Sequence, residues 1–278
     1  MIAAQVAHEH GTQNIAFVAV SIGLALAGSF AALVSAIRLS SSPKARRGRW
    51  ILASAVSLGG GAIWSMHFMG MLGYHVDGRT IVYDLPLTAL SLVIAVGASA
   101  LGLATVASKP DSRTRLVVSG VLTGLGVAAM HYTGMAAMHA GSSVSYDPAL
   151  VAASVGIAVV AALAALWIVF RVRTGLHVAL ASAVMAGAVC GMHYTAMAAT
   201  RVAVSDYPAV GNGADPIVLS FPVCVIAFTV LALIILAAFD GFGDSGRSPL
   251  TGGGDPRTAH ESTTGGRRRR SIQRSTLG

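Results

Sequence analysis

The heptapeptide SMHFMGM occupies Ser65–Met71 at the end of a long apolar run, and the chain repeats its pattern twice. AMHYTGM lies at Ala129–Met135 and GMHYTAM at Gly191–Met197. Each copy, called a motif below, sets Met, His and an aromatic residue in succession and has a second Met four residues after the His. A helix that only faces lipid needs no ionisable side chain at one depth. The motifs therefore predict a shared site on a repeated helical scaffold.

The composition indicates a membrane protein. The chain has 278 residues, of which 54% are hydrophobic and 11% charged, and its mean hydropathy is +0.71. Soluble domains carry about 25% charged residues, so this chain has too few polar side chains to cover a globular surface in water. Cys190 and Cys224 both lie in apolar stretches and predict no disulfide framework. The opening segment MIAAQVAHEHGTQN lacks the basic start of a cleavable signal, so the first apolar run is expected to remain in the protein.

Seven apolar runs are each close to the ~20 residues that an α-helix needs to cross a bilayer. They cover Asn14–Ile37, Trp50–Met71, Leu85–Ala107, Leu116–Met138, Leu150–Phe170, Leu176–Ala199 and Ile217–Phe239. Backbone polar groups find no water in lipid, so runs of this length are expected to be helices. The predicted fold is an all-α integral membrane protein with seven transmembrane helices in one domain, residues 1–239.

The loop charges predict the orientation. RLSSSPKARRGR, SKPDSRTR and RVRTG are basic, whereas the loops between them contain only two arginines, Arg79 and Arg201. The other 17 of the 19 lysines and arginines lie in the basic loops or near the C-terminus. Basic loops stay in the cytoplasm, so we expect an N-terminus outside, a C-terminus inside, and motifs near the extracytoplasmic face of the plasma membrane. Topology then explains the net charge of +8, and no nucleic-acid partner is expected.

An internal repeat organises the spans. The motif histidines are His67, His131 and His193, at intervals of 64 and 62 residues. Each interval holds one full span, a basic loop and most of another span, so the unit is a helix pair used three times with a seventh helix added. Small residues precede each motif, as in SLGGGAIW, LTGLGVAA and VMAGAVCG. Because glycine and alanine let membrane helices approach closely, the second, fourth and sixth spans are expected to be the inner ones.

Residues 240–278 form a predicted tail that is rich in Gly, Ser, Thr and Arg and almost free of apolar residues. Such a composition cannot bury a core, so the tail is expected to be disordered, basic and cytoplasmic. The alternatives for Arg267–Arg270 are attraction to anionic lipid headgroups and simple solvation.

The functional interpretation of the motifs is a metal site. Neutral imidazole and soft thioether are ligands that suit copper, Cu(I) above all. The three motif histidines are the primary candidates, and each shares a helical face with the Met four residues later. The candidate methionine ligands are Met71, Met135 and Met197, with Met66, Met130 and Met192 one residue before each His. The candidates for a second layer are His75, His139 and Cys190.

The structural alternative is that these residues only pack. A single intramembrane His usually bonds a neighbouring helix, and a single Met usually fills a core. The threefold coincidence favours the ligand interpretation, because ionisable residues inside spans are rare and usually functional. The aromatic residues Phe68, Tyr132 and Tyr194 are expected in an interfacial belt.

With MHYTGM, MHYTAM and the variant MHFMGM, the chain resembles the MHYT domain, a bacterial integral-membrane module of repeated helix pairs. The resemblance covers nearly all of the chain up to about Phe239. It implies a sensory module, proposed to bind copper near the outer face through Met and His and to perceive oxygen, carbon monoxide or nitric oxide. Many members continue into a cyclic-di-GMP or kinase domain. No such domain follows the seventh span here, so a standalone member without an output domain is expected.

These observations favour a membrane-embedded, non-catalytic sensor that binds copper, perceives a diatomic gas or redox signal, and acts on a separate cytoplasmic signalling protein. The alternatives are copper transport or handling and haem binding through two of the histidines. Transport would need a second layer of ligands toward the cytoplasm, and three equivalent copies fit a metal layer better than a paired haem. The chain has no phosphate-binding loop, no Cys-x-x-Cys and no Ser/His/Asp arrangement, so no enzymatic activity is expected. The sequence leaves the oligomeric state open.

Overall fold

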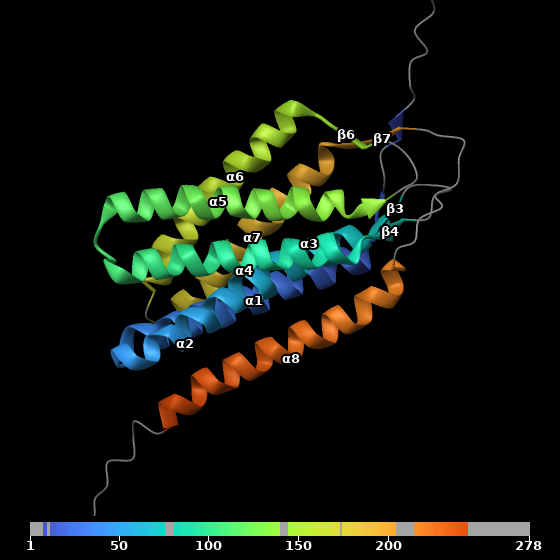
Figure 1. Cartoon of the computed structure of the whole chain (residues 1–278). Helices are drawn as coiled ribbons and strands as arrows, with labels where there is room; N and C mark the ends of the chain where they lie inside the picture. The colour runs from blue at the N-terminus through green and yellow to red at the C-terminus, as the bar shows by residue number, and fades with distance from the viewer. Residues whose placement is uncertain are drawn as a thin grey trace, which may run out of the picture.

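Seven helical spans make up the fold (Figure 1). The computed structural model describes residues 8–9, 12–75, 81–139, 144–172, 174–203 and 214–243. The helices are α1 (Ile15–Ser41), α2 (Lys44–Ala55), η1 (Val56–Trp64), α3 (Ser65–Leu72), α4 (Leu85–Ser108), α5 (Arg113–Ala136), α6 (Pro148–Val169), α7 (Gly175–Ala198) and α8 (Pro216–Gly243). Of these, α2, η1 and α3 follow one another without a break and form the second span. The predicted all-α fold with seven spans is confirmed.

Helix α8 continues to Gly243, so it includes the first residues of the predicted tail. The remainder of the tail, with Arg267–Arg270, lies outside the described residues.

Short polar side chains start the first helix of each pair. Asn14, Asp84 and Asp147 are the N-caps of α1, α4 and α6, and their side chains accept hydrogen bonds from backbone N–H groups of the first turn at 2.8–3.3 Å. Such a cap satisfies a donor that has no partner within the helix and typically stabilises it by about 1 kcal/mol. The three caps occupy equivalent places in the repeat, which shows that the helix pairs share their start signal.

Six of the seven spans form a closed ring. Within it η1 packs on α4, α4 on α5, α5 on α6, α6 on α7, α7 on α1, and α1 on η1. The second span also contacts α5 and α7, so the three motif-bearing spans meet inside the ring. Helix α8 lies outside the ring against α1, α3 and η1 (Figure 1).

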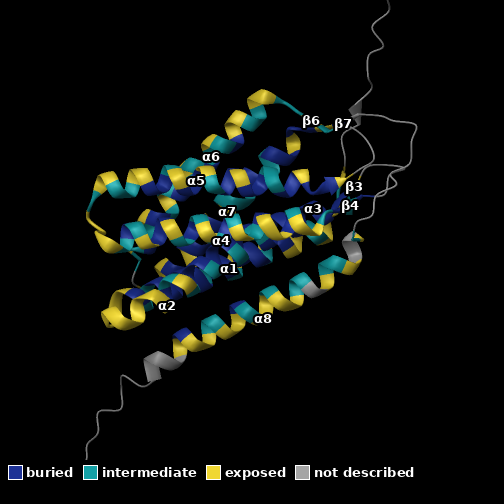
Figure 2. Ribbon diagram, in the orientation of Figure 1, coloured by how far each residue is buried: buried dark blue, intermediate teal, exposed yellow. Residues whose placement is uncertain are grey.

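The burial of the spans agrees with the prediction that the second helix of each pair is the inner one. The buried share of an 18-residue stretch is 72% in the second span against 50% in α1, 44% in α5 against 33% in α4, and 39% in α7 against 22% in α6. The second helix of every pair is thus the inner one, as expected. Helix α1 is nevertheless more buried than α5 or α7, because α8 covers part of its outer face. Figure 2 shows the exposed residues on the outward faces of the helices.

Short strands, which the sequence did not predict, join the helices at one end. They are β1 (His8–Glu9), β2 (Thr12–Gln13), β3 (Tyr74–His75), β4 (Val82–Tyr83), β5 (Met138–His139), β6 (Val144–Tyr146) and β7 (Thr200–Ala203). The antiparallel pairs are β2 with β3, β4 with β5, and β6 with β7, while β1 adds to β7. In each unit the strand before the first helix pairs with the strand after the second, so every helix pair is closed by its own strand pair.

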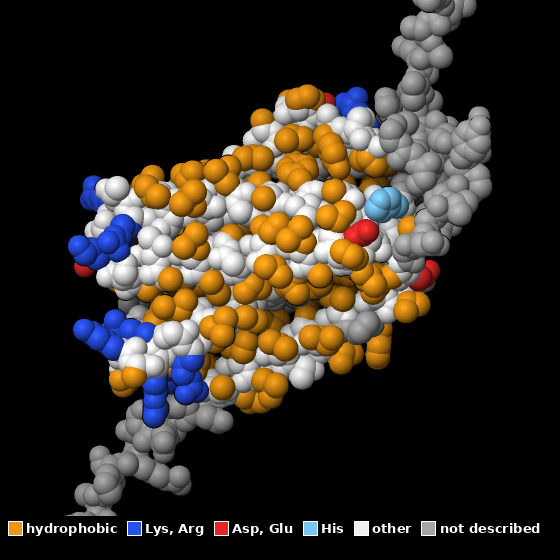
Figure 3. All heavy atoms as spheres, viewed as in Figure 1, with side chains coloured by type: hydrophobic (Ala, Val, Ile, Leu, Met, Phe, Trp, Pro, Cys, Tyr) orange, Lys and Arg blue, Asp and Glu red, His pale blue; other side chains and the backbone are white. Residues whose placement is uncertain are grey.

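The two ends of the bundle differ in charge. Lys and Arg gather at the end opposite the strands, and apolar side chains cover the middle (Figure 3). At the strand end the described charged residues are few, and include Asp84, Asp147 and Arg201. A wide apolar band between polar ends is the surface that a bilayer requires. The asymmetry agrees with the positive-inside expectation; the orientation itself remains a prediction.

A π-helix interrupts the second span. η1 covers nine residues, VSLGGGAIW. At its end the Gly60 carbonyl accepts a hydrogen bond from the N–H of Ser65, five residues later, which is the wider spacing of a π-helix. The Ser65 hydroxyl donates to the same carbonyl at 2.7 Å. π-Helices are rare and usually brief. The glycines around η1 allow close backbone contact, since a Cβ at Gly59 would lie 2.4 Å from the Ala95 carbonyl oxygen, and one at Gly28 would lie 2.2 Å from the Ala62 nitrogen.

We predict that Gly28→Ala destabilises the bundle by about 1–3 kcal/mol, because the added methyl meets backbone atoms that cannot rotate away. Gly23→Ala is the matched control on the same helix, since its Cβ would meet nothing within 4 Å. Thermal unfolding of both variants in detergent measures the difference. Equal melting temperatures for the two variants would contradict the close contact between α1 and η1.

Candidate metal centre

The three motif histidines meet in one buried cluster, called the triad below. His67, His131 and His193 come from α3, α5 and α7 and are at most 1% exposed. One ligand nitrogen from each lies within 4.8 Å of the others, and the ring centroids are 4.6, 5.1 and 5.3 Å apart. Among the described residues, this is the one group of three or more His, Cys, Asp or Glu donors packed so closely. The structure therefore brings together side chains that are 62 and 64 residues apart in sequence.

Most of the triad's nitrogens have no hydrogen-bond partner. His67 Nδ1 and His193 Nδ1 pair with each other at 3.1 Å, one donating and the other accepting. Among the described residues nothing bonds His67 Nε2, His193 Nε2 or either nitrogen of His131. Buried polar atoms are normally paired, and leaving one unpaired costs roughly 1–3 kcal/mol. With one nitrogen of each ring within 4.8 Å of the others, the triad offers a donor set that fits a metal ion.

Two glycines make room for the imidazoles. A Cβ at Gly70 would lie 2.3 Å from His193 Nε2, and a Cβ at Gly134 would lie 2.3 Å from His67 Nε2. Each glycine is three residues after the histidine of its own motif. The imidazoles of His193 and His67 therefore pack against the backbone of the first and the second motif, respectively. These two glycines were not among the predicted site residues, although the MGM and TGM endings of the first two motifs display them. The third motif has Ala196 there.

The candidate methionines are all buried, at 1–5% exposure. Met71, Met135 and Met197, four residues beyond each histidine, lie together in one apolar cluster at the strand end of the bundle. The methionines that precede each histidine are divided, because Met130 and Met192 belong to the main core whereas Met66 packs with Ala25 and Ala186. The structure thus unites the first set in one layer on the strand side of the triad, and does not unite the second.

The second-layer candidates lie outside the triad. His75 and His139 are exposed on β3 and β5, and their Nδ1 atoms donate to the carbonyls of Gly73 and Ala137, each at 3.1 Å. They occupy equivalent places in the first two strand pairs and hold the turn after the motif helix. Cys190 is half-buried beside Met66 and Ala186 and is not one of the clustered donors.

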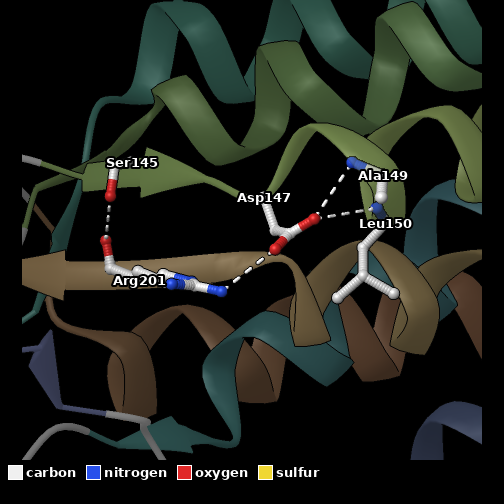
Figure 4. A network of polar contacts seen from close by, with 5 residues as sticks. All are labelled: Ser145, Asp147, Ala149, Leu150 and Arg201. Carbon is white, nitrogen blue, oxygen red and sulfur yellow. Dashed lines mark hydrogen bonds and ion pairs between the residues drawn. The ribbon is translucent and has the colours of Figure 1, made fainter.

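In the third unit an ion pair takes the place of this histidine. Arg201 replaces it, and its guanidinium donates to Asp147 at 3.0 Å (Figure 4). The other carboxylate oxygen of Asp147 caps α6 through Ala149 and Leu150, and the Ser145 hydroxyl donates to the Arg201 carbonyl. Backbone bonds of 2.9 Å run from Asn14, Asp84 and Asp147 to Gly73, Ala137 and Ala199, so all three strand pairs fix the helix ends alike.

The motif aromatics were predicted to form an interfacial belt, but they lie between helices. Tyr132 donates its hydroxyl to Ser154 on α6 at 2.9 Å, and Tyr194 donates to Ser21 on α1 at 2.8 Å, since both serines give their own hydrogen to a carbonyl of their helix. These bonds pull the aromatic groups inward from the lipid.

Phe68 cannot make this bond, and the first unit uses a different donor. The indole N–H of Trp64 donates to Ser91 on α4 at 3.0 Å, and the Phe68 ring stacks on Trp64 with centroids 5.2 Å apart. Ser21, Ser91 and Ser154 each lie seven residues after an N-cap, so three equivalent bonds join each motif-bearing span to the first helix of another unit.

Tyr83 joins β4 to the end of α3. Its hydroxyl donates to the Met71 carbonyl at 2.9 Å, and burial raises the pKa of the phenol. The phenol therefore remains a donor at any physiological pH, and this bond holds the strand pair against the motif helix.

The family model for "MHYT: Bacterial signalling protein N terminal repeat" matches three times, over residues 60–119, 124–182 and 187–245. The chain belongs to the MHYT family. Each match begins at a glycine a few residues before a motif, at Gly60, Gly124 or Gly187, with one motif histidine near its start. The predicted threefold repeat and the predicted family are therefore confirmed.

Curated MHYT relatives are longer signalling proteins. The chain is 41% identical over 231 residues to the bifunctional diguanylate cyclase/cyclic di-GMP phosphodiesterase MucR of Pseudomonas aeruginosa, covering 81% of this chain and 33% of that protein. It is 37% identical over 237 residues to the cyclic di-GMP phosphodiesterase NbdA of the same organism, covering 82% and 30%. It is 30% identical to the signaling protein YkoW of Bacillus subtilis, covering 68% and 24%. The chain thus spans about a third or less of these relatives. No solved structure matches it.

We predict that Gly134→Ala displaces the His67 ring, because the new methyl would occupy the position that the imidazole nitrogen now approaches. NMR spectra of the histidine side chains should change, and the melting temperature should fall. Gly191→Ala is the control, since it lies two residues before His193 and its Cβ would meet nothing within 4 Å. Unchanged histidine spectra in a folded Gly134→Ala protein would refute the packing of His67 on this glycine.

Proposed function

We propose that this MHYT domain is a membrane-embedded sensor that binds copper at the triad and perceives a diatomic gas or a redox signal. The observation that carries the proposal is the group of four buried imidazole nitrogens without partners among the described residues. Family membership supports a signalling role, and the names of the relatives place MHYT repeats in proteins of cyclic di-GMP metabolism.

The donors favour copper among the common metals. Three neutral imidazoles with soft thioethers in the adjacent layer suit Cu(I), whereas magnesium or calcium would require oxygen ligands that the triad lacks. His67, His131 and His193 would hold the ion, and Met71, Met135 and Met197 are the sulfur donors of the neighbouring layer. When bound, copper supplies a centre that changes oxidation state or takes a gaseous ligand. The protein excludes water and restricts access, since every member of the triad is buried.

The geometry favours a single ion over haem. The triad's ring centroids are 4.6–5.3 Å apart, and the Nδ1 atoms of His67 and His193 are within hydrogen-bonding distance. A bis-histidine haem would need a flat macrocycle between two axial imidazoles, and rings this close together leave no room for one.

The surroundings of the triad favour sensing over transport. One helical turn toward the basic end, the positions four residues before each histidine are Ile63, Val127 and Val189. These side chains offer no ligand to a cation moving inward. A bound ion would instead act on the packing of the second span, α5 and α7, whose opposite ends begin at Lys44, Arg113 and Gly175 near the basic surface.

Transmission to a partner follows from this architecture. The basic loop ends of the bundle, with the arginines of α2, would face the cytoplasm under the predicted orientation, and the triad would lie near the extracytoplasmic face. A separate cytoplasmic signalling protein would then read a shift of the motif-bearing spans at the basic end.

Metal analysis tests the proposal. After reconstitution with Cu(I), the wild-type chain should retain stoichiometric copper, and the triple variant His67→Ala, His131→Ala, His193→Ala should lose it. His177→Ala is the control, because this exposed histidine lies at the other end of α7. Copper-free wild type, or equal copper in the triple variant, would reject the site. A Soret band would indicate haem, and copper flux into vesicles would indicate transport.

A further inference from the structure

An apolar cavity lies one helical turn from the triad, toward the basic end. Ile63, Val127 and Val189 line it, and each of these residues lies one helical turn from a motif histidine on the same face. The cavity therefore begins one helical turn from the three imidazoles, and α6 together with Ser99 of α4 completes its lining.

A second layer continues the lining by another turn. Thr123 and Met185 lie eight residues before their histidines, and Leu58 lies nine residues before His67. The additional residue in the first unit falls within η1, where the π-helix accommodates it. The motif-bearing span of every unit thus contributes to one space, and residues of α6 and α7 supply most of the remaining lining.

The size of the cavity limits its occupant. Its volume is about 40 Å³. A single water needs roughly 10–15 Å³ on the same measure, so the space admits a molecule of two or three heavy atoms but no metabolite.

The lining selects against water and ions. Apart from the hydroxyls of Ser99 and Thr123 the side chains are apolar, and the Thr123 hydroxyl donates to the Ala98 carbonyl at 3.4 Å. An internal water normally has two to four polar partners, and apolar cavities remain dry yet bind xenon or benzene. The favoured occupant is therefore uncharged and apolar.

Helix α6 separates the cavity from the lipid by small side chains. Ala161 and Ala165 line the cavity and are only half-buried, while Ala162 between them is buried. The wall at this place is a layer of methyl groups. Small apolar gases dissolve in hydrocarbon, so they can reach the cavity from the bilayer without passing through the strand end.

We propose that this cavity is a docking site for an uncharged apolar gas of diatomic size, placed one helical turn from the triad. The physiological role of the site rests on the proposed sensor function, because it would concentrate gas beside the copper ligands. The binding itself depends only on the cavity.

Xenon is the probe. ¹²⁹Xe NMR of the full chain in detergent, without copper, should show a saturable shift for the wild type. Ala162→Leu fills the cavity and should abolish that shift, whereas Ala164→Leu, on the exposed face of the same helix, should leave it unchanged. Leu166→Ala enlarges the space and should strengthen xenon binding even if Ala162→Leu fails to fold.

Two results would overturn the proposal. One is a wild-type protein whose xenon shift is linear and equal to that of the detergent alone. The other is a folded Ala162→Leu protein, or an enlarged Leu166→Ala protein, with the wild-type shift. Copper content, measured on the same samples, separates the two proposals: saturable xenon without copper refutes only the metal site, and copper without saturable xenon refutes only the gas site.

Discussion

Burial of three imidazoles in one space is the constraint on which the other features of the molecule depend. The rings of His67, His131 and His193 can approach to 4.6–5.3 Å only if their helices cross closely at that level. Gly70 and Gly134 provide the space, because a side chain at either position would collide with a neighbouring imidazole. The unpaired nitrogens are costly to bury in a bundle that is otherwise apolar. This cost is expected at a functional site, and it makes the triad, rather than the general apolar core, the feature that the repeat serves.

The repeat holds the triad through interactions that recur in all three units with different residues. An N-cap residue bonds the turn after the motif helix at 2.9 Å in every unit, and a serine on each first helix accepts a bond from a motif-bearing span. The side chains differ between units. Trp64 donates to the serine in the first unit as a tyrosine does in the other two, and the ion pair of Arg201 with Asp147 stands in the third unit where the others have a histidine bonded to a carbonyl. Such exchange indicates that the position of the donor is maintained, and that the residue type is secondary.

The first unit has one more residue than the other two between the cavity layer and the motif histidine, and the wider turn of the π-helix accommodates it. With η1 in place, Leu58 joins the cavity layer formed by Thr123 and Met185, while Ile63 and His67 remain in register with the other units. The same span contacts α1, α4 and α8 through close glycine positions. It is the most buried span of the seven, and its packing therefore influences the triad, the cavity and the outer helix together.

The sequence alone determined the seven spans, the threefold repeat, the family and the candidate histidines, because hydropathy and motif spacing are properties of the chain itself. The inner position of the second helix in each pair also followed from its small residues. Only the tertiary structure decided which side chains of different helices contact one another. Helical spacing places His131 and Met135 on one face, but the rotation of α5 relative to α3 and α7 decides what that face meets. The packing of His67 on Gly134, the strand pairs and the cavity depend on contacts between residues far apart in the chain, which local patterns do not encode.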